Sequence, residues 1–152
     1  MSEPTTVREL RPGDRERWAQ LHRGYTDFYE VPTSDEARER VWGWLLAHEH
    51  GLVGLVAEQD GGVVGIAHVR PVVRMLHARV DGYLDDLFVD PEARGSGAAT
   101  ALLDAVRRLG AQRGWRAVRW LTSDTNARAR AFYEREGASP TPFVTYDLPT
   151  AP

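Results

Sequence analysis

A run of small residues with one cation, RGSGAA at positions 94–99, stands directly before a segment with helical periodicity. Small side chains let a ligand approach the backbone closely. The first N–H groups of a helix have no partner within it, and the helix dipole adds partial positive charge at that end. The run therefore predicts an anion-binding site, with phosphate as the expected anion.

Three familiar phosphate-binding motifs do not match. The chain contains no lysine, which both the triphosphatase loop G-x-x-x-x-G-K-[ST] and the kinase signature require. The dinucleotide fingerprint G-x-G-x-x-G fails because Gly97 is followed by Ala98, Ala99 and Thr100. The pattern that remains is R-G-x-G-x-A.

The apolar periodicity predicts a mixed α/β fold with the order β-α-α-β-β-β-α-β-α-β. Asp14 is the expected cap of the first helix, the TSDE segment at 33–36 opens the second as a capping box, and Asn126 caps the last. The expected strands are 6–10, 52–59, 63–70, 80–90, 116–122 and 143–148, and the later helices are 98–113 and 127–136. The first helix has an apolar face made of Trp18, Leu21, Tyr25 and Phe28.

We expect one domain over residues 1–148 and a frayed tail over 149–152. The antiparallel strands precede a β-α-β crossover, which should be right-handed. The RGSGAA run lies at the strand-to-helix turn of that crossover, where open α/β sheets usually bind ligands.

The composition narrows the classes of function. Of 152 residues, 42% are hydrophobic, and the net charge is −3 with basic residues spread along the chain, which disfavours nucleic-acid binding. No apolar stretch approaches the length of a membrane span and no signal peptide is evident, so we expect no membrane partner and a cytoplasmic location. The chain has no cysteine, which excludes disulfides, a thiolate nucleophile and Cys-based zinc sites, and we expect no metal.

Two segments together resemble the GNAT superfamily of acyl-CoA-dependent N-acyltransferases. The segment YLDDLFVDPEARGSGAATALLDAV carries the family pattern [RQ]-x-x-G-x-[GA] after a strand, and WLTSDTNARARAFYEREGA carries N-x-x-A-x-x-[FL]-Y-x-x-x-G. The likeness covers residues 83–138, and the order of the preceding elements agrees with the family fold, whose central sheet is splayed. The matching positions are Arg94, Gly97, Ala99, Asn126, Ala129, Phe132, Tyr133 and Gly137.

The resemblance implies acetyl-CoA as co-substrate. Its pyrophosphate would be held by backbone N–H groups of residues 95–100 and by charge-assisted contact with Arg94. Main-chain groups of residues 87–89 would bind the pantetheine arm like a neighbouring strand and polarise the thioester carbonyl. The implied cofactor-binding residues are Leu87, Phe88, Val89, Arg94, Gly95, Ser96, Gly97, Ala98, Ala99, Thr100 and Asn126.

Acetyl transfer to an amine requires deprotonation of the amine, alignment of both substrates and neutralisation of the leaving thiolate. Tyr133 occupies the family position whose phenol can protonate that thiolate; alternatively, it is only an apolar staple of its helix beside Phe132. The absence of cysteine favours direct transfer over an acyl-enzyme.

Asp85 is the candidate base or water-holder, because YLDDLFV resembles the YLED strand of the spermidine/spermine and histone/polyamine branch. The alternative is a sheet aspartate paired with an arginine. Strand alternation predicts Asp86 on the opposite face, as a structural partner. His68 is a reserve proton acceptor, and Tyr29 with Glu30 could hold an amine by cation–π and carboxylate contacts.

These observations predict an N-acetyltransferase that moves acetyl from acetyl-CoA to a primary amine of a polyamine, diamine or lysine-like small molecule. The alternatives are a protein lysine or N-terminus, an aminoglycoside, or a CoA-binding regulatory domain without turnover. The strand at 143–148 would be an exposed edge, which suggests a homodimer.

Overall fold

A computed structural model describes residues 3–151; residues 1, 2 and 152, which the predicted domain and tail include, lie outside the described part. The chain forms two compact units, the first ending at Leu121 and the second beginning at Thr122. The first unit contains β1 (Thr6–Glu9), α1 (Arg15–Phe28), α2 (Asp35–Leu46), β2 (Val53–Gln59), β3 (Gly62–Arg74), β4 (Arg79–Val89), α3 (Ala98–Gln112) and β5 (Val118–Arg119). Short 3-10 turns are η1 (Pro12–Asp14), η2 (Glu49–Gly51), η3 (Met75–His77) and η4 (Pro91–Ala93). The second unit contains α4 (Ala127–Arg135).

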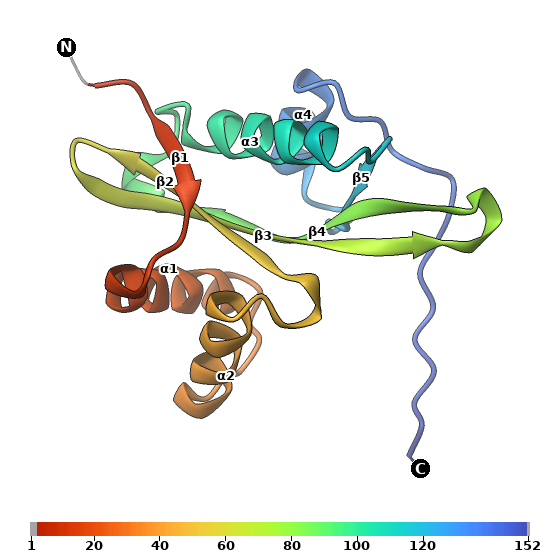
Figure 1. The fold of residues 1–152 in the computed structure, drawn as a ribbon, viewed down its shortest axis with the longest axis horizontal. Helices are drawn as coiled ribbons and strands as arrows, with labels where there is room; N and C mark the ends of the chain where they lie inside the picture. The colour runs from red at the N-terminus through yellow and green to blue at the C-terminus, as the bar shows by residue number, and fades with distance from the viewer. Residues whose placement is uncertain (1–2, 152) are drawn as a thin grey trace. The chain divides into compact units, whose positions relative to one another are not determined.

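The five strands form one sheet in the order β1-β2-β3-β4-β5. The first four strands pair antiparallel, and β5 is parallel to β4. Helices α1 and α2 cover one face of this sheet and α3 covers the other (Figure 1). The mixed α/β fold predicted from the periodicity is therefore confirmed.

The core between α1, α2 and the sheet is built from large apolar side chains. Trp18 and Leu21 of α1 are almost fully buried, whereas Phe28, predicted on the same apolar face, is 56% exposed. Each fully buried side chain of this size stabilises the fold by about 1.5–3 kcal/mol. The cluster comprises Leu10, Trp18, Leu21, Trp42, Leu45, Val56, Val63, Ile66 and Phe88.

The sheet opens beside the second half of β4. β5 pairs with β4 through Gly82↔Val118 and Tyr83↔Arg119, while β4 continues to Val89. A Cβ atom at Gly82 would lie 2.4 Å from the ring of Trp115. Only glycine therefore fits at this position, where β4 pairs with β5. The edge from Leu84 onward is left without a β5 pair in the described residues.

The predicted strand at 143–148 is wrong: residues 138–148 contain neither helix nor strand. Four apolar side chains there are 75–89% exposed: Phe143, Val144, Tyr146 and Leu148. A strand exists only through hydrogen bonds to a neighbour, so alternation alone does not create one. The predicted strand at 116–122 is likewise reduced to its two central residues in β5.

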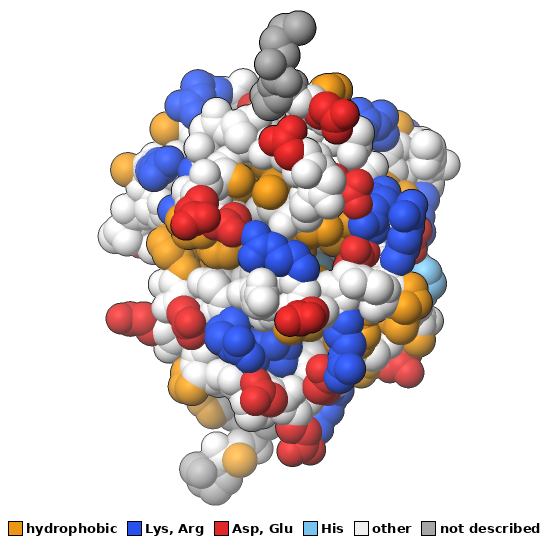
Figure 2. All heavy atoms as spheres, turned by 90° about the vertical axis from the view of Figure 1, so that its left-hand side faces the viewer, with side chains coloured by type: hydrophobic (Ala, Val, Ile, Leu, Met, Phe, Trp, Pro, Cys, Tyr) orange, Lys and Arg blue, Asp and Glu red, His pale blue; other side chains and the backbone are white. Residues whose placement is uncertain are grey.

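Within residues 3–151, no helix combines the length and apolar character needed to cross a membrane. On the face shown in Figure 2, basic and acidic side chains are interspersed rather than gathered by sign.

Candidate functional site

The start of α3 is shaped to admit an anion. Gly97 is the N-cap residue with φ +90°, and no side chain caps the helix. Gly95 also has positive φ, and a Cβ atom at either glycine would meet nothing within 4 Å. The backbone therefore requires glycine at both positions, and the ligand-facing space is open. The first amides of this 15-residue helix have no side-chain cap, and the phosphate site expected there stays a prediction.

Side chains from distant parts of the chain hold this loop in place. The Arg17 guanidinium binds the Asp90 carboxylate at 2.6 Å and donates to the Val63 carbonyl at 2.9 Å. The Gln59 side-chain amide donates to the Ser96 hydroxyl at 2.8 Å. Gln59 and Arg17 are not predicted from the sequence, because their partners are 37 and 73 residues away.

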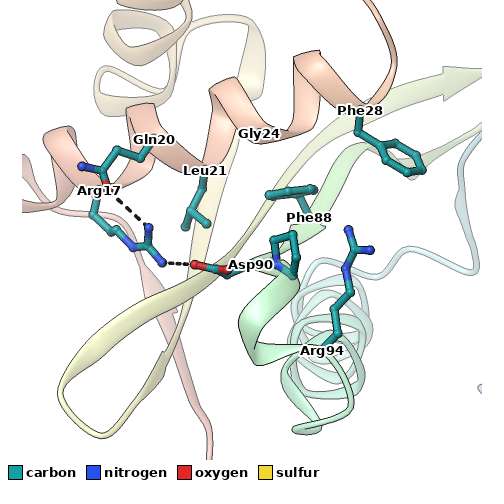
Figure 3. Close-up of a pocket in the computed structure, with 9 residues that line it drawn as sticks. Arg17, Gln20, Leu21, Gly24, Phe28, Phe88, Asp90 and Arg94 are labelled. Atoms are coloured by element: carbon teal, nitrogen blue, oxygen red, sulfur yellow. Dashed lines mark hydrogen bonds and ion pairs between the residues drawn. The ribbon is translucent and has the colours of Figure 1, made fainter.

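A pocket of about 280 Å³ lies between α1 and the end of β4. Figure 3 shows Gly24 and Phe28 on its α1 side and Phe88 and Arg94 on the other. The Arg94 guanidinium carbon lies 5.9 Å from the centre of the Phe88 ring. A cation thus borders both the pocket and the glycine loop. The uncapped helix start, Arg94 and the open edge of β4 fit a long, phosphate-bearing ligand such as CoA.

A β-bulge in β4 changes the predicted orientation of Asp86. His68 pairs with Asp86 and Val69 with Leu84, so Asp85 is the additional residue. His68 and Arg70 of β3 share a face, and they bind Asp86 and Asp85, respectively. The prediction that Asp86 lies on the opposite face from Asp85 is therefore wrong. The bulge interrupts the alternation, and both carboxylates face α1.

Asp85 is half-buried and paired with Arg70. The Arg70 Nε–H donates to Asp85 Oδ2 at 2.8 Å, and the Arg70 guanidinium carbon lies 4.7 Å from the centre of the Tyr83 ring. Burial raises the pKa of the Asp85 carboxyl, although the Arg70 hydrogen bond acts in the opposite direction. The predicted alternative, a sheet aspartate paired with an arginine, is what the structure shows. The pairing leaves Asp85 with 30% side-chain exposure.

Asp86 is held by a buried chain of hydrogen bonds. The Trp18 indole N–H donates to His68 Nε2 at 2.9 Å, and His68 Nδ1 lies 2.7 Å from Asp86 Oδ2. The Tyr25 hydroxyl also hydrogen-bonds the Asp86 side chain. Burial acts to raise the pKa of Asp86, but the hydrogen bonds outweigh it and the pKa lies below its ordinary value. Since both ring nitrogens of His68 are engaged, it is not the reserve proton acceptor that the sequence suggested.

The predicted amine-binding residues lie at the end of α1. Tyr29 is 41% exposed, and its ring makes an edge contact with Tyr25 at 5.0 Å between centroids. The Tyr25 hydroxyl in turn lies 3.5 Å from the main-chain oxygen of Asp85. Glu30 follows in the left-handed region, with φ +55°, and is exposed. The structure therefore connects Tyr29 to the bulge through one aromatic side chain.

The second unit contains the other predicted residues. The Asn126 side chain caps α4 by accepting from the Ala129 N–H at 3.1 Å, which confirms the predicted cap. The rings of Phe132 and Tyr133 pack at 5.6 Å between centroids. Gly137 follows the helix with φ +95°. The roles of Tyr133 in catalysis and of Asn126 in cofactor binding stay predictions.

Comparison with known proteins places these features in a family. Residues 18–138 match the model of the acetyltransferase (GNAT) family. The aminoglycoside N(6')-acetyltransferase type 1 of Stenotrophomonas maltophilia is 31% identical over 144 residues, which covers 93% of this chain and 90% of that protein. The uncharacterized N-acetyltransferase YhfO of Bacillus subtilis (strain 168) is 29% identical over 143 residues, 93% of this chain and 95% of that protein.

A solved structure shares the fold. The aminoglycoside N-acetyltransferase AAC(6')-Iy, in complex with CoA, superposes with a TM-score of 0.86 and 23% sequence identity. The similarity covers 99% of this chain and 97% of that one. At this identity the likeness concerns the fold.

Proposed function

The chain belongs to the acetyltransferase (GNAT) family and is an acetyl-CoA-dependent acetyltransferase. On that premise, we propose that it acetylates a primary amine of a small cationic molecule. The observation that carries this proposal is the bulge in β4, which directs the two carboxylates of Asp85 and Asp86 to one face beside an open strand edge. Carboxylates at this position favour an acceptor that arrives as an ammonium ion.

In this proposal the first unit binds the co-substrate. The amides of residues 95–100 and the Arg94 guanidinium hold the pyrophosphate. The main chain of Leu87, Phe88 and Val89 holds the pantetheine arm along the open edge of β4. Acetyl-CoA supplies an activated acetyl group as a thioester.

Two side chains move protons. A lysine-like amine has a pKa of ~10.4 and arrives protonated, so Asp85 accepts one ammonium proton, directly or through water. The freed nitrogen lone pair then forms the new C–N bond as the C–S bond breaks. The Tyr133 hydroxyl donates its proton to the leaving sulfur, and the second proton of the nitrogen, which is lost as the amide forms, returns to the Tyr133 oxygen through water. Burial favours this role for Asp85, because it makes the carboxylate a better base than an exposed one.

Aminoglycosides are the first candidate acceptors, and polyamines or diamines are the second. The aminoglycoside candidate is supported by the 31% identity to the Stenotrophomonas enzyme along 93% of the chain. The polyamine candidate is supported by the strand YLDDLFV, with aspartate where that branch has glutamate. Both classes carry several ammonium groups, which is the chemistry that paired carboxylates select.

The test is release of free CoA thiol from acetyl-CoA, measured with kanamycin, spermidine, a diamine, an amino acid and a lysine peptide. The proposal predicts turnover with kanamycin or spermidine well above that with the amino acid and the peptide. Turnover only with the lysine peptide would contradict it. CoA binding without thiol release from any acceptor would favour the regulatory alternative.

We also propose that the chain forms a homodimer in which residues 143–148 take part. Phe143, Val144, Tyr146 and Leu148 are 75–89% exposed, and a second copy would cover these apolar side chains. Light scattering should give twice the monomer mass of 17.0 kDa. A monomer at micromolar concentration would contradict this.

A further inference from the structure

We infer that Asp86, fixed by a neutral His68, binds the acceptor's ammonium group and so determines the preference for cationic amines. The inference rests on the proposed function and adds a specificity-determining residue to it. It follows from the chemistry of the groups that contact each of the two neighbouring carboxylates.

The hydrogen-bond directions around His68 define its protonation. An indole N–H can only donate, so the 2.9 Å contact from Trp18 Nε1 uses the lone pair of His68 Nε2. The ring proton must then be on Nδ1, which donates to Asp86 Oδ2 at 2.7 Å. A proton on both nitrogens would set two donors against each other at Nε2. His68 therefore orients Asp86 without neutralising its charge.

The neighbouring buried histidine is locked in the same way. The Arg38 Nε–H donates to His22 Nδ1 at 3.1 Å, and an arginine N–H cannot accept. The His22 ring stacks on Trp18 with 4.8 Å between centroids, while Arg38 also reaches Asp35 and Thr26. The side chains behind Asp86 are thus neutral rings, and the nearby Arg38 binds His22, Asp35 and Thr26 rather than Asp86.

The carboxylates of Asp85 and Asp86 differ in which groups compensate their negative charge. Asp85 receives both Nε–H and an Nη–H of Arg70, at 2.8 and 3.3 Å, so its charge is matched by a guanidinium. Asp86 has hydrogen-bond donors, the His68 ring and the Tyr25 hydroxyl, and among residues 3–151 no arginine forms an ion pair with it. The uncompensated negative charge at the bulge therefore belongs to Asp86.

The Asp86 side chain is accessible to solvent, whereas the two side chains behind it, Trp18 and His68, are buried. Its side chain is 26% exposed, whereas Trp18 and His68 are 1% and 2% exposed. One carboxylate oxygen faces the buried ring, and the exposed remainder can accept ammonium hydrogens. A rigid neutral donor fixes the position of the carboxylate and leaves the full negative charge of the carboxylate in place. This arrangement suits a cation-binding site.

The experiment measures binding separately from turnover. Kanamycin and spermidine are titrated calorimetrically into the CoA-saturated wild type and the Asp86→Asn, Asp86→Glu and Asp85→Asn variants. Asp86→Asn should raise the Kd of both amines about tenfold or more, since a charge-assisted bond is lost. Asp86→Glu should recover part of the affinity, and Asp85→Asn should change it less than Asp86→Asn does. CoA affinity serves as the control for folding.

The outcomes separate the inference from the proposed function. An unchanged Kd in Asp86→Asn, a larger loss in Asp85→Asn, or a wild type that binds neither amine would overturn the role of Asp86. Amine binding without acetylation would contradict the proposed function alone and leave this role supported.

The positioning role of His68 has its own readout. Nitrogen NMR of the wild type at neutral pH should show His68 as the Nδ1–H tautomer with a hydrogen-bonded Trp18 indole. Trp18→Phe removes the indole N–H and should release that tautomer and weaken amine binding, with CoA affinity retained. A doubly protonated His68 in the wild type would contradict the assignment.

Discussion

A Cβ atom on Gly24 of α1 would lie 3.0 Å from the Cε1 and Cζ atoms of the Phe88 ring. The helix therefore passes so close to the end of β4 that a methyl group would displace the ring. Phe88 is 7% exposed and belongs to the main-chain segment proposed to hold the pantetheine arm. The contact links the packing of α1 to the position of the open strand edge.

Gly24→Ala should raise the KM for acetyl-CoA several-fold. Alanine favours the helix by about 1 kcal/mol, but the displaced Phe88 ring alters the pocket and the strand beside it. The matched control is Gly43→Ala on α2, where a Cβ atom would meet nothing within 4 Å. Steady-state kinetics that show the same KM in both variants would refute this coupling.

Arg94→Ala should weaken acetyl-CoA binding by about ten- to a hundredfold, because a charge-assisted contact to phosphate is lost. Rising salt should weaken the wild type more than the variant. Arg40→Ala is the control, since the side chain of Arg40 is 60% exposed and lies on α2. Calorimetric titration with CoA measures both. Equal affinities in Arg94→Ala and wild type would place the pyrophosphate elsewhere.

Tyr133→Phe should lower kcat by about a hundredfold through loss of the general acid, while leaving acetyl-CoA affinity unchanged. Tyr146→Phe removes an equivalent hydroxyl from a side chain that is 89% exposed, and it should retain full activity. The prediction is wrong if Tyr133→Phe retains wild-type kcat, in which case the residue only packs beside Phe132.

Acidification should destabilise the fold through His22. Burial lowers the pKa of His22 from 6.5 to about 4 in the folded protein. Between these values the unfolded state binds more protons than the folded state, so stability is lost as pH falls from about 6.5 to about 4. The full shift corresponds to about 3 kcal/mol.

Denaturant unfolding of the wild type and His22→Gln across that pH range measures this contribution. The variant should show a shallower fall in unfolding free energy, whereas His77→Gln, at an exposed position, should match the wild type. Parallel curves for His22→Gln and wild type would show that His22 does not titrate on unfolding.

The sequence predicts features that are encoded locally. The α3 start and the Asn126 cap follow from nearby residue types, and the structure agrees. The bulge at Asp85 is different, because it depends on the register between β3 and β4. Alternation within β4 alone therefore misplaced Asp86.

Local sequence patterns also do not predict contacts between residues that are far apart in the chain. The bond from Gln59 to Ser96 and the Trp18–His68 contact join residues 37 and 50 positions apart. The segment 143–148 shows the opposite error, since its strand-like alternation is not accompanied by a paired neighbour in the described residues. Propensity supplies a candidate strand, and pairing decides whether it forms.

The central claim is that acetyl passes from acetyl-CoA to the nitrogen of a small cationic amine. The most direct measurement follows free CoA thiol and the mass of the acceptor together, with kanamycin and then spermidine. The account predicts one thiol released for each acetyl group gained by the amine. Thiol release without an acetylated amine, or no release by a protein that binds CoA, would contradict it.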